Sequence, residues 1–425
     1  MKSTLVIFGI TGDLAQRKLL PALSNVIEAG KCGDLRIIGV SRRQVERFEI
    51  LGEHHEQLAG TTSLFQMDLN NSDDYVQLGE YINAEEDEQV LYYLSVPPDS
   101  VANIIEHLGQ AGLNGPKSKL LLEKPFGKDL ESAQAMIDHT AAYFSEPQIY
   151  RIDHFLAKEM AQNIVAFRAR NALFSNLWSN RYIESISVLA LESIGIEGRA
   201  TFYEQTGALR DIVQGHLMQL LALVLAPLPD GLDWDSLPSQ RFAALEAITP
   251  ADPAKSYRGH YEGYREEVNN PQSSVETFVS LELRSEDPTW QNVPLILTTG
   301  KALDSKKTEV RVRFRRAHDN QSDCLVFKIQ PNEGIEIDLV TKKPGYDQEL
   351  EHQKLSYMYP SDMRLPDAYE QVLVDALNSR KSLFATSSEV LQSWKILAPL
   401  QKAWKSQFGM RVYIPGATME DVINR

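Results

Sequence analysis

Short apolar runs alternate with helix-like stretches in the first third of the chain, and this alternation restricts the fold more than any other feature. The first run is followed by a glycine turn and by an apolar-periodic stretch at Leu14–Ile27. The runs themselves are Leu5–Phe8, Leu35–Val40, Val90–Val96 and Lys119–Leu122. Continuous apolar runs separated by helices are typical of a parallel sheet buried on both faces. We therefore predict a doubly wound, Rossmann-like α/β domain, which binds a dinucleotide, over residues 1–152.

The pattern changes after residue 152, where strand-like runs follow one another with few helices between the last four. These runs are Tyr182–Leu191, Ser274–Leu283, Val293–Leu297, Glu309–Phe314 and Leu325–Ile329. This order predicts an α+β domain over residues 153–425 with a large, mainly antiparallel sheet. We expect helices at Gly207–Leu225, Asp367–Ser379 and Ser388–Phe408 to cover that sheet. Asp230–Pro271 is polar and rich in Pro and Gly, so we interpret it as a long excursion and not as a linker between domains.

Charge and cysteine content exclude several classes of protein. A net charge of -15 argues against general binding to nucleic acid or to anionic membranes. Cys32 and Cys324 are far apart, which excludes a disulfide framework and a thiolate zinc site and fits a reducing cytosol. The N-terminus is interpreted as a buried strand and not a signal peptide, and no apolar run approaches the roughly 20 residues that span a bilayer. We predict a cytoplasmic protein with neither nucleic-acid nor membrane partners.

A glycine turn follows the first predicted strand, at Gly9-Ile10-Thr11-Gly12-Asp13-Leu14. Glycines at such a turn let the backbone approach a pyrophosphate and direct N–H groups at it. The spacing is G-x-x-G and not G-x-G-x-x-G, so an ordinary strand–turn–helix corner remains an alternative.

Two arginines follow the second predicted strand, in Ser41-Arg42-Arg43. NAD enzymes usually have an acidic residue at this strand end, where it binds the ribose 2′-hydroxyl. Guanidinium groups beside a hydroxyl suit a 2′-phosphate instead, so the sequence favours NADP. The alternative is that both arginines are solvated surface residues.

The segment Arg151–Glu159 concentrates charge at what we predict to be the start of a helix. If Asp153 caps that helix, His154 and Lys158 lie four residues apart on one face, near its first free N–H groups. A helix N-terminus with a nearby lysine and histidine can receive a phosphate dianion. A capped surface helix with a solvated lysine is the alternative.

Two further motifs carry groups suited to chemistry. Glu123-Lys124-Pro125-Phe126-Gly127 lies at the carboxyl end of a predicted parallel strand, where open α/β sheets bind ligands, and its proline is a candidate for a cis peptide. His216 lies in an apolar predicted helix, where a buried structural histidine is the alternative to a base. Asp211 and His216 are five apart, about 140° around a regular helix, so we do not expect them to pair.

These motifs together resemble the glucose-6-phosphate dehydrogenase family over nearly the whole chain, in collinear order. The matching motifs are Gly-x-x-Gly-Asp-Leu at 9–14, Glu-Lys-Pro-Phe-Gly at 123–127, Arg-Ile-Asp-His at 151–154, Lys-Glu at 158–159, Glu-Gly-Arg at 197–199, Gln-x-His at 214–216, Val-Glu-Thr-Phe-Val at 275–279, Thr-Gly-Lys-Ala-Leu at 299–303, Ile-Gln-Pro-Asn-Glu-Gly at 329–334, Pro-Asp-Ala-Tyr-Glu at 366–370 and Trp394.

The resemblance implies oxidation of D-glucose 6-phosphate at C1 with hydride transfer to NADP. It implies that His216 is the base, that Asp153 orients it, and that His154 and Lys158 bind the 6-phosphate. The family positions that hold the sugar correspond to Lys124, Glu192, Asp211, Lys301 and Lys306. Those on the cofactor side correspond to Gly9, Thr11, Gly12, Asp13, Leu14, Arg42, Tyr93 and Lys124. The resemblance also implies that residues 153–425 bind the substrate and mediate oligomerisation, as a homodimer or homotetramer. No metal is needed.

A few positions depart from the family pattern. Phe155 stands where a tyrosine usually gives its hydroxyl to the phosphate, a loss of about 1 kcal/mol. Ala157, Gly215 and Thr298 replace a glycine, an asparagine and an arginine. These changes affect affinity and substrate range more than the type of reaction. Two other hypotheses are a related dehydrogenase of another sugar or sugar phosphate, and a catalytically silent NADP-binding protein.

Overall fold

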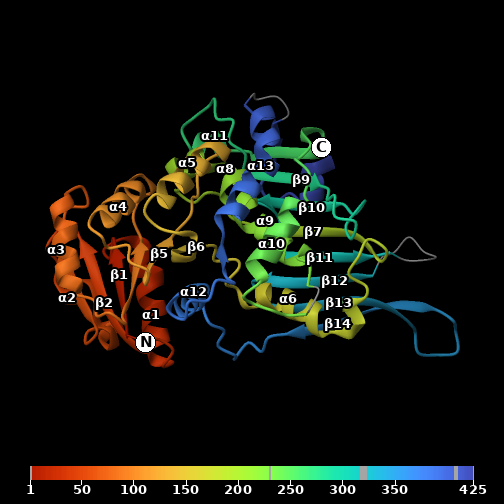
Figure 1. Cartoon of the computed structure of the whole chain (residues 1–425). Coiled ribbons are helices and arrows are strands. Elements are labelled where there is room, and N and C mark those ends of the chain that lie inside the picture. The colour runs from red at the N-terminus through yellow and green to blue at the C-terminus, as the bar shows by residue number, and fades with distance from the viewer. Residues whose placement is uncertain (1, 229–230, 316–322, 406–409, 425) are drawn as a thin grey trace. The chain divides into compact units, whose positions relative to one another are not determined.

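The computed structural model describes residues 2–228, 231–315, 323–405 and 410–424. The chain divides into two compact units, each with its own sheet (Figure 1). The first unit comprises Met1–Gly127, Glu131–Ala157 and Pro366–Val390, and the second comprises Lys128–Leu130, Lys158–Leu365 and Leu391–Arg425. Pro366–Val390 therefore belongs to the first unit although it lies late in the sequence.

The sheet of the first unit has the order β15-β6-β5-β4-β1-β2-β3. Its strands are β1 (Lys2–Phe8), β2 (Asp34–Ser41), β3 (Thr62–Gln66), β4 (Gln89–Leu94), β5 (Ser118–Leu122), β6 (Ile149–Ile152) and β15 (Phe384–Ala385). All neighbours pair in parallel except β15, which is antiparallel to β6. The predicted Rossmann-like sheet is confirmed, and the four apolar runs form β1, β2, β4 and β5 because these strands are buried on both faces.

Helices connect these strands and pack on the sheet (Figure 1). They are η1 (Ala15–Leu19), α1 (Leu20–Glu28), α2 (Arg47–Leu51), η2 (Glu53–Leu58), α3 (Ser72–Ile82), α4 (Pro98–Gln110), α5 (Leu130–Ala141), η3 (Glu146–Gln148) and α12 (Ala368–Leu377). Helix α12 packs against α1. The expectation that the helix at Asp367–Ser379 covers the antiparallel sheet is therefore wrong, because its apolar face is buried in the core of the first unit.

The sheet of the second unit has the order β14-β13-β12-β11-β7-β10-β9-β8-β16. Its strands are β7 (Ile183–Leu191), β8 (Ser256–Tyr261), β9 (Phe278–Leu283), β10 (Leu295–Gly300), β11 (Lys307–Phe314), β12 (Cys324–Gln330), β13 (Gly334–Lys342), β14 (Leu350–Met358) and β16 (Met410–Tyr413). Pairing is antiparallel except between β7 and β10 and between β8 and β16. The predicted large, mainly antiparallel sheet is confirmed.

The helices of the second unit are α6 (Glu159–Arg170), α7 (Ala172–Ser175), α8 (Ala200–Ala208), η4 (Leu209–Leu217), α9 (Met218–Leu225), α10 (Leu237–Glu246), η5 (Pro253–Lys255), α11 (Tyr264–Glu267), α14 (Met419–Asn424) and, from residue 391 on, α13 (Ser387–Ala403). Of these, α9 and α10 are drawn across the large sheet in Figure 1. Helix η4 packs against β7 and β10, and α6 packs against β12.

The most apolar helical stretch, Ala200–Leu225, passes a length and hydropathy test for a membrane span. Within the most apolar 18 residues of this stretch, 78% is buried inside the structure, which is typical of a core helix. The stretch is also interrupted at Gly207, where the backbone leaves helical geometry.

The segment Asp230–Pro271 is more regular than predicted. Over its described residues it contains α10, η5, β8 and α11, and β8 pairs with β9 and β16 inside the large sheet. The interpretation as an excursion is wrong for β8, because this strand pairs with β9 and β16 inside the large sheet. The segment is not a linker between domains, as predicted, since it lies within the second unit.

Candidate functional site

The turn after β1 is a tight corner that requires glycine at its first position. Gly9 has φ +81°, and a Cβ on it would lie 2.2 Å from the carbonyl oxygen of Ser95. The N–H of Gly12 donates to the carbonyl of Gly9 at 2.9 Å, and η1 begins three residues later. The predicted strand–glycine turn–helix order is thus present at the carboxyl end of the sheet, where a pyrophosphate can approach backbone N–H groups.

Ser41, Arg42 and Arg43 lie beside that corner. Strand β2 pairs in parallel with β1, and the N–H of Gly9 donates to Val40 at 3.2 Å. Ser41 is buried, its Oγ accepts from the N–H of Arg43 at 3.3 Å, and both arginine side chains are exposed. Two exposed guanidinium groups next to a glycine corner suit a 2′-phosphate.

Three elements meet at the carboxyl end of β5, around Glu123. The hydroxyl of Tyr93, the fifth residue of β4, donates a short hydrogen bond to Glu123, and the hydroxyl of Tyr369 on α12 also donates to it. Burial raises the pKa of Glu123 to about 7, although the Tyr93 bond and the charge of Lys124 act in the opposite direction. The Lys124–Pro125 peptide is cis, as predicted.

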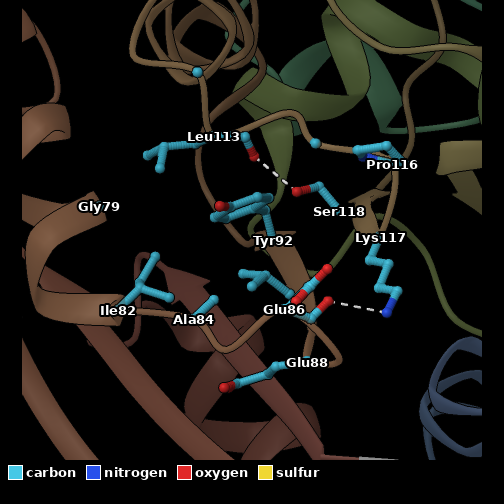
Figure 2. Close-up of a pocket in the computed structure, with 13 residues that line it drawn as sticks. Gly79, Ile82, Ala84, Glu86, Glu88, Tyr92, Leu113, Pro116, Lys117 and Ser118 are labelled. Atoms are coloured by element: carbon cyan, nitrogen blue, oxygen red, sulfur yellow. Dashed lines mark hydrogen bonds between the residues drawn. The ribbon is translucent and has the colours of Figure 1, made fainter.

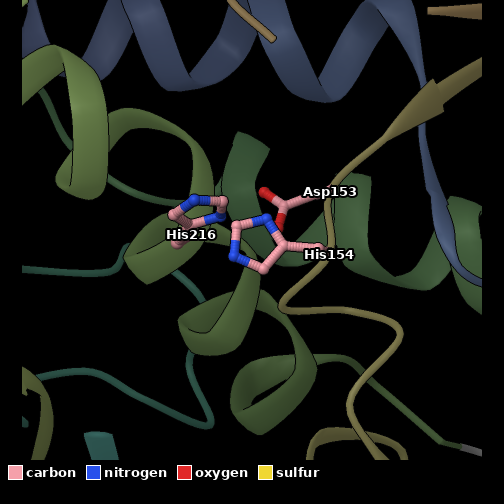
Figure 3. Close-up of side chains that lie close together, drawn as sticks. All are labelled: Asp153, His154 and His216. Atoms are coloured by element: carbon pink, nitrogen blue, oxygen red, sulfur yellow. The ribbon is translucent and has the colours of Figure 1, made fainter. Parts of the chain in front are cut away.

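Asp153 and His154 directly follow β6 (Figure 3). Asp153 is 2% exposed, and its Oδ1 accepts from the N–H of Phe155 at 2.9 Å. The N–H of Leu156 donates to the carbonyl of Asp153 at 3.1 Å, so residues 153–156 form a turn. The half-buried imidazole of His154 lies edge-on to Phe155, with ring centroids 4.9 Å apart.

The helix expected to begin at Asp153 begins later. Helix α6 starts at Glu159, and Lys158 is its N-cap with extended φ/ψ. His154 and Lys158 therefore do not share a helical face, because the Asp153 side chain closes a separate turn. The N–H of Met160, in the first turn of α6, donates to the carboxylate of Glu333 at 3.0 Å. Burial raises the pKa of Glu333, and the nearby charge of Lys158 lowers it.

Helix η4 carries Asp211 and His216 and is a π-helix over its whole length. His216, shown in Figure 3, is 3% exposed, whereas Asp211 is half-buried. Because π-helices bond residue i to residue i+5, residues five apart are about one turn apart. The argument that Asp211 and His216 lie about 140° apart is therefore wrong, since it assumed α-helical geometry.

Lys301 and Glu192 form an ion pair at the ends of two neighbouring strands. Strands β7 and β10 are parallel, with Leu191 opposite Gly300, so the residues that follow them emerge side by side. Lys301 is 4% exposed, and its Nζ lies 5.4 Å from the ring centroid of Tyr203. The Tyr203 hydroxyl is buried and has no hydrogen-bond partner among the described residues. Lys306, just before β11, is exposed.

A cavity of about 400 Å³ lies at the opposite end of the parallel sheet of the first unit (Figure 2). Its lining includes Val90 and Tyr92 of β4, Leu113, and Ser118 at the start of β5. The Oγ of Ser118 donates to the carbonyl of Leu113 at 2.9 Å. None of the residues predicted for the reaction lines this cavity.

A glycine corner at the carboxyl end of a parallel sheet is typical of dinucleotide-binding domains, and the match to an NAD binding domain over residues 6–163 places this chain among the NAD(P)-binding oxidoreductases. Two family models match in order: glucose-6-phosphate dehydrogenase, NAD binding domain, over residues 6–163, and its C-terminal domain over residues 165–421. The chain belongs to the glucose-6-phosphate dehydrogenase family.

Individual relatives agree over almost their full length. The glucose-6-phosphate 1-dehydrogenases of Gluconobacter oxydans and Bacillus subtilis are each 35% identical, over 97% and 95% of this chain and 93% and 92% of theirs. A solved glucose-6-phosphate dehydrogenase in complex with glucose-6-phosphate aligns with TM-score 0.92 and 28% identity, covering 100% of this chain and 96% of its own. The Mycobacterium avium enzyme aligns with TM-score 0.88 and 31% identity, covering 98% of this chain and 94% of its own.

Sequence reasoning assigned no role to several residues that contact or neighbour the predicted site. These are Glu123, Tyr203, Glu276, Glu333 and Tyr369. All but Tyr203 lie inside motifs that carried the family resemblance, so membership of a motif was the signal that could have found them.

Proposed function

We propose that this enzyme oxidises β-D-glucose 6-phosphate at C1 to 6-phospho-D-glucono-1,5-lactone, with NADP⁺ as the oxidant. The observation that carries the proposal is the match of both family models, in order, over nearly the whole chain. When bound, NADP⁺ accepts the hydride that leaves C1.

His216 is the base that takes the proton of the C1 hydroxyl, and Asp153 orients the imidazole and stabilises its charged form. Both side chains are almost fully buried, which favours fixed geometry and strengthens electrostatic interaction. The Phe155 N–H bond to Asp153 fixes one carboxylate oxygen, which limits the rotation of that side chain.

His154 and Lys158 bind the 6-phosphate. Lys158 stands at the N-cap of α6, whose helix dipole favours an anion. The Glu333 carboxyl group, whose pKa is raised by burial, already accepts a hydrogen bond from one N–H of that first turn. Lys158 and His154 therefore supply most of the attraction for the phosphate. The sugar is held by Lys124, Glu192, Asp211, Lys301 and Lys306.

Residues at the glycine corner bind the cofactor. Gly9, Thr11, Gly12, Asp13 and Leu14 line the pyrophosphate, and the remaining cofactor residues are Arg42, Tyr93 and Lys124. Arg42 recognises the 2′-phosphate because the end of β2 offers cations where an NAD enzyme offers a carboxylate. We assign cofactor binding to residues 1–152 and substrate binding to residues 153–425.

Oligomerisation and location complete the proposal. The edge strand β14 exposes Leu350, Leu355 and Tyr357, and an exposed apolar edge strand favours pairing with another copy. The enzyme is a homodimer or homotetramer and acts in the cytoplasm, in keeping with its two free cysteines. Sedimentation velocity tests the first statement, and a monomer at micromolar concentration contradicts it.

A single assay tests the reaction. Formation of reduced nicotinamide is followed by absorbance with glucose 6-phosphate, glucose or fructose 6-phosphate, each with NADP⁺ and with NAD⁺. We expect the highest kcat/KM with glucose 6-phosphate and NADP⁺. Higher activity with an unphosphorylated sugar supports the related-dehydrogenase alternative, and cofactor binding without turnover supports the silent one.

A further inference from the structure

The motif Val275-Glu276-Thr277 precedes β9 and has no role in the reaction described above. Glu276 is 8% exposed and contacts the start of η4 twice. Its Oε1 accepts from the N–H of Leu209 at 3.0 Å, and its carbonyl oxygen accepts from the N–H of Ala208 at 2.9 Å. One residue therefore binds two of the backbone donors that the first turn of a helix leaves unpaired.

The helical stretch is interrupted at Gly207, just before η4, and this residue lies against the same carboxyl group. Gly207 has φ 64° and ψ 172°, a conformation almost restricted to glycine. A Cβ on Gly207 would lie 2.6 Å from Glu276 Oε1 and 3.1 Å from Val275 Cγ1. Gly207 thus permits both the turn into η4 and the close approach of the Glu276 carboxyl group.

Thr277, the next residue of the motif, contacts the backbone of Lys301, which is also proposed to bind the sugar. The N–H of Lys301 donates to the carbonyl of Thr277 at 3.0 Å. The hydroxyl of Tyr413 donates to the carbonyl of Lys301 at 2.7 Å and lies 2.8 Å from Thr277 Oγ1. The backbone of Lys301 is therefore bonded on both sides, once directly to Thr277 and once through Tyr413.

We propose that Glu276 is a positioning residue: by anchoring the first turn of η4 it fixes where Asp211 and His216 stand, while Thr277 beside it fixes Lys301. This inference rests on the proposed function, in which His216 is the base. A change of one residue in the start of η4 would turn Asp211 and His216 onto a different face of the helix. Reacting groups tolerate far smaller displacements than this before the rate falls.

The chemistry of Glu276 fits this role. Burial raises the pKa of its carboxyl group, while the Leu209 N–H and the charges of Arg210 and Arg258 lower it. The Leu209 N–H at the start of η4 donates to an oxygen of residue 276, so this residue must offer an acceptor oxygen at that position. Glutamine offers such an oxygen, whereas methionine has similar size and offers none.

The test compares Glu276→Gln with Glu276→Met, each as the full chain, in the glucose 6-phosphate assay with NADP⁺. We expect kcat of the methionine variant to be at least about tenfold below that of the glutamine variant, because only glutamine keeps the Leu209 bond. Glu282→Gln, on β9 and paired with Lys255 and Arg284, is the matched control and should keep the parent kcat. Equal kcat values for the two Glu276 variants overturn the proposal.

A second variant decides the question if Glu276→Met does not fold. Gly207→Ala leaves residue 276 unchanged but displaces its carboxyl group, so kcat should fall at least about fivefold. A folded Gly207→Ala enzyme with the parent kcat overturns the proposal. His216→Asn separates the two claims: if it abolishes turnover while the Glu276 variants behave alike, only the positioning role fails.

Discussion

In the first unit most of the proposed site residues follow the carboxyl ends of parallel strands, whereas in the second unit most of them stand on a π-helix or at one parallel pair within a mainly antiparallel sheet. Lys124 is the second residue after β5, and Asp153 comes directly after β6. His216 depends on helix η4, whose start is bonded to Glu276. The first arrangement is set by sheet topology, and the second by a few specific contacts.

Electrostatic balance also differs between the units. In the first, the Glu123 carboxyl group accepts bonds from Tyr93 and Tyr369 and has a pKa raised to about 7 by burial. In the second, the buried Lys301 is paired with Glu192. The first unit thus holds a carboxyl group, that of Glu123, which changes charge near neutral pH. The second holds a lysine, Lys301, whose positive charge is balanced by the carboxylate of Glu192.

The largest effect tests the orienting role in the first unit. Asp153→Asn keeps an oxygen for the Phe155 N–H but loses the charge, so we expect kcat to fall roughly 10³-fold or more. The measurement is steady-state kinetics, with the exposed Asp87→Asn as the control. A fall in kcat of less than about tenfold would show that Asp153 does not orient the base, although it directly follows strand β6.

Glu123→Gln tests the difference in charge between the units. Because the folded-state pKa of about 7 lies above the ordinary value of 4.5, the folded protein binds more protons between these pH values. Stability is therefore lost as pH rises from about 4.5 to about 7, by up to about 3 kcal/mol, and glutamine removes this loss. The melting temperature of the variant relative to the parent should rise between pH 5 and pH 8.

The exposed Glu86→Gln variant is the control for that experiment, and its relative melting temperature should not change with pH. A constant difference for Glu123→Gln would mean that Glu123 is ionised over the whole range.

Lys158→Ala tests whether the N-cap of α6 binds phosphate. Loss of one charge-assisted hydrogen bond should raise KM for glucose 6-phosphate by roughly ten- to a hundredfold and leave kcat/KM for glucose unchanged. Lys343→Ala, at an exposed ion pair of the β13–β14 hairpin, is the control. Equal losses with both sugars contradict phosphate binding.

The smallest effect concerns the cofactor. Because Arg42 is exposed, its contact with a 2′-phosphate is partly screened by solvent, and Arg42→Ala should raise KM for NADP⁺ by roughly tenfold. KM for NAD⁺ serves as the internal control and should stay within about twofold. Parallel increases for both cofactors would remove the case for NADP preference.

The parallel sheet could be predicted because β1, β2, β4 and β5 are continuous apolar runs. Strand β3 escaped prediction because its sequence, Thr-Ser-Leu-Phe-Gln, is only partly buried and mixes polar with apolar residues. Strand β15 has two residues, and its pairing with β6 joins positions more than 200 residues apart. No local pattern encodes such a partner.

Motifs let the sequence propose a set of candidate site residues, but they do not predict the geometry of those residues. The start of α6 was misplaced because Asp153 is a preferred N-cap residue and Lys158 is not, so the observed start runs against the local signal. The π-helical form of η4 has no distinct sequence signature, since its apolar pattern also fits an α-helix. Gly207 was read as the first helical residue, although its φ of 64° excludes it from the helix.

The central claim is that His216 removes the C1 proton, and the kcat of His216→Asn with glucose 6-phosphate and NADP⁺ tests it most directly. The account predicts a fall of at least about 10³-fold in kcat, with KM for the sugar within about threefold of the parent value. A folded His216→Asn enzyme that retains kcat within about tenfold of the parent would contradict it.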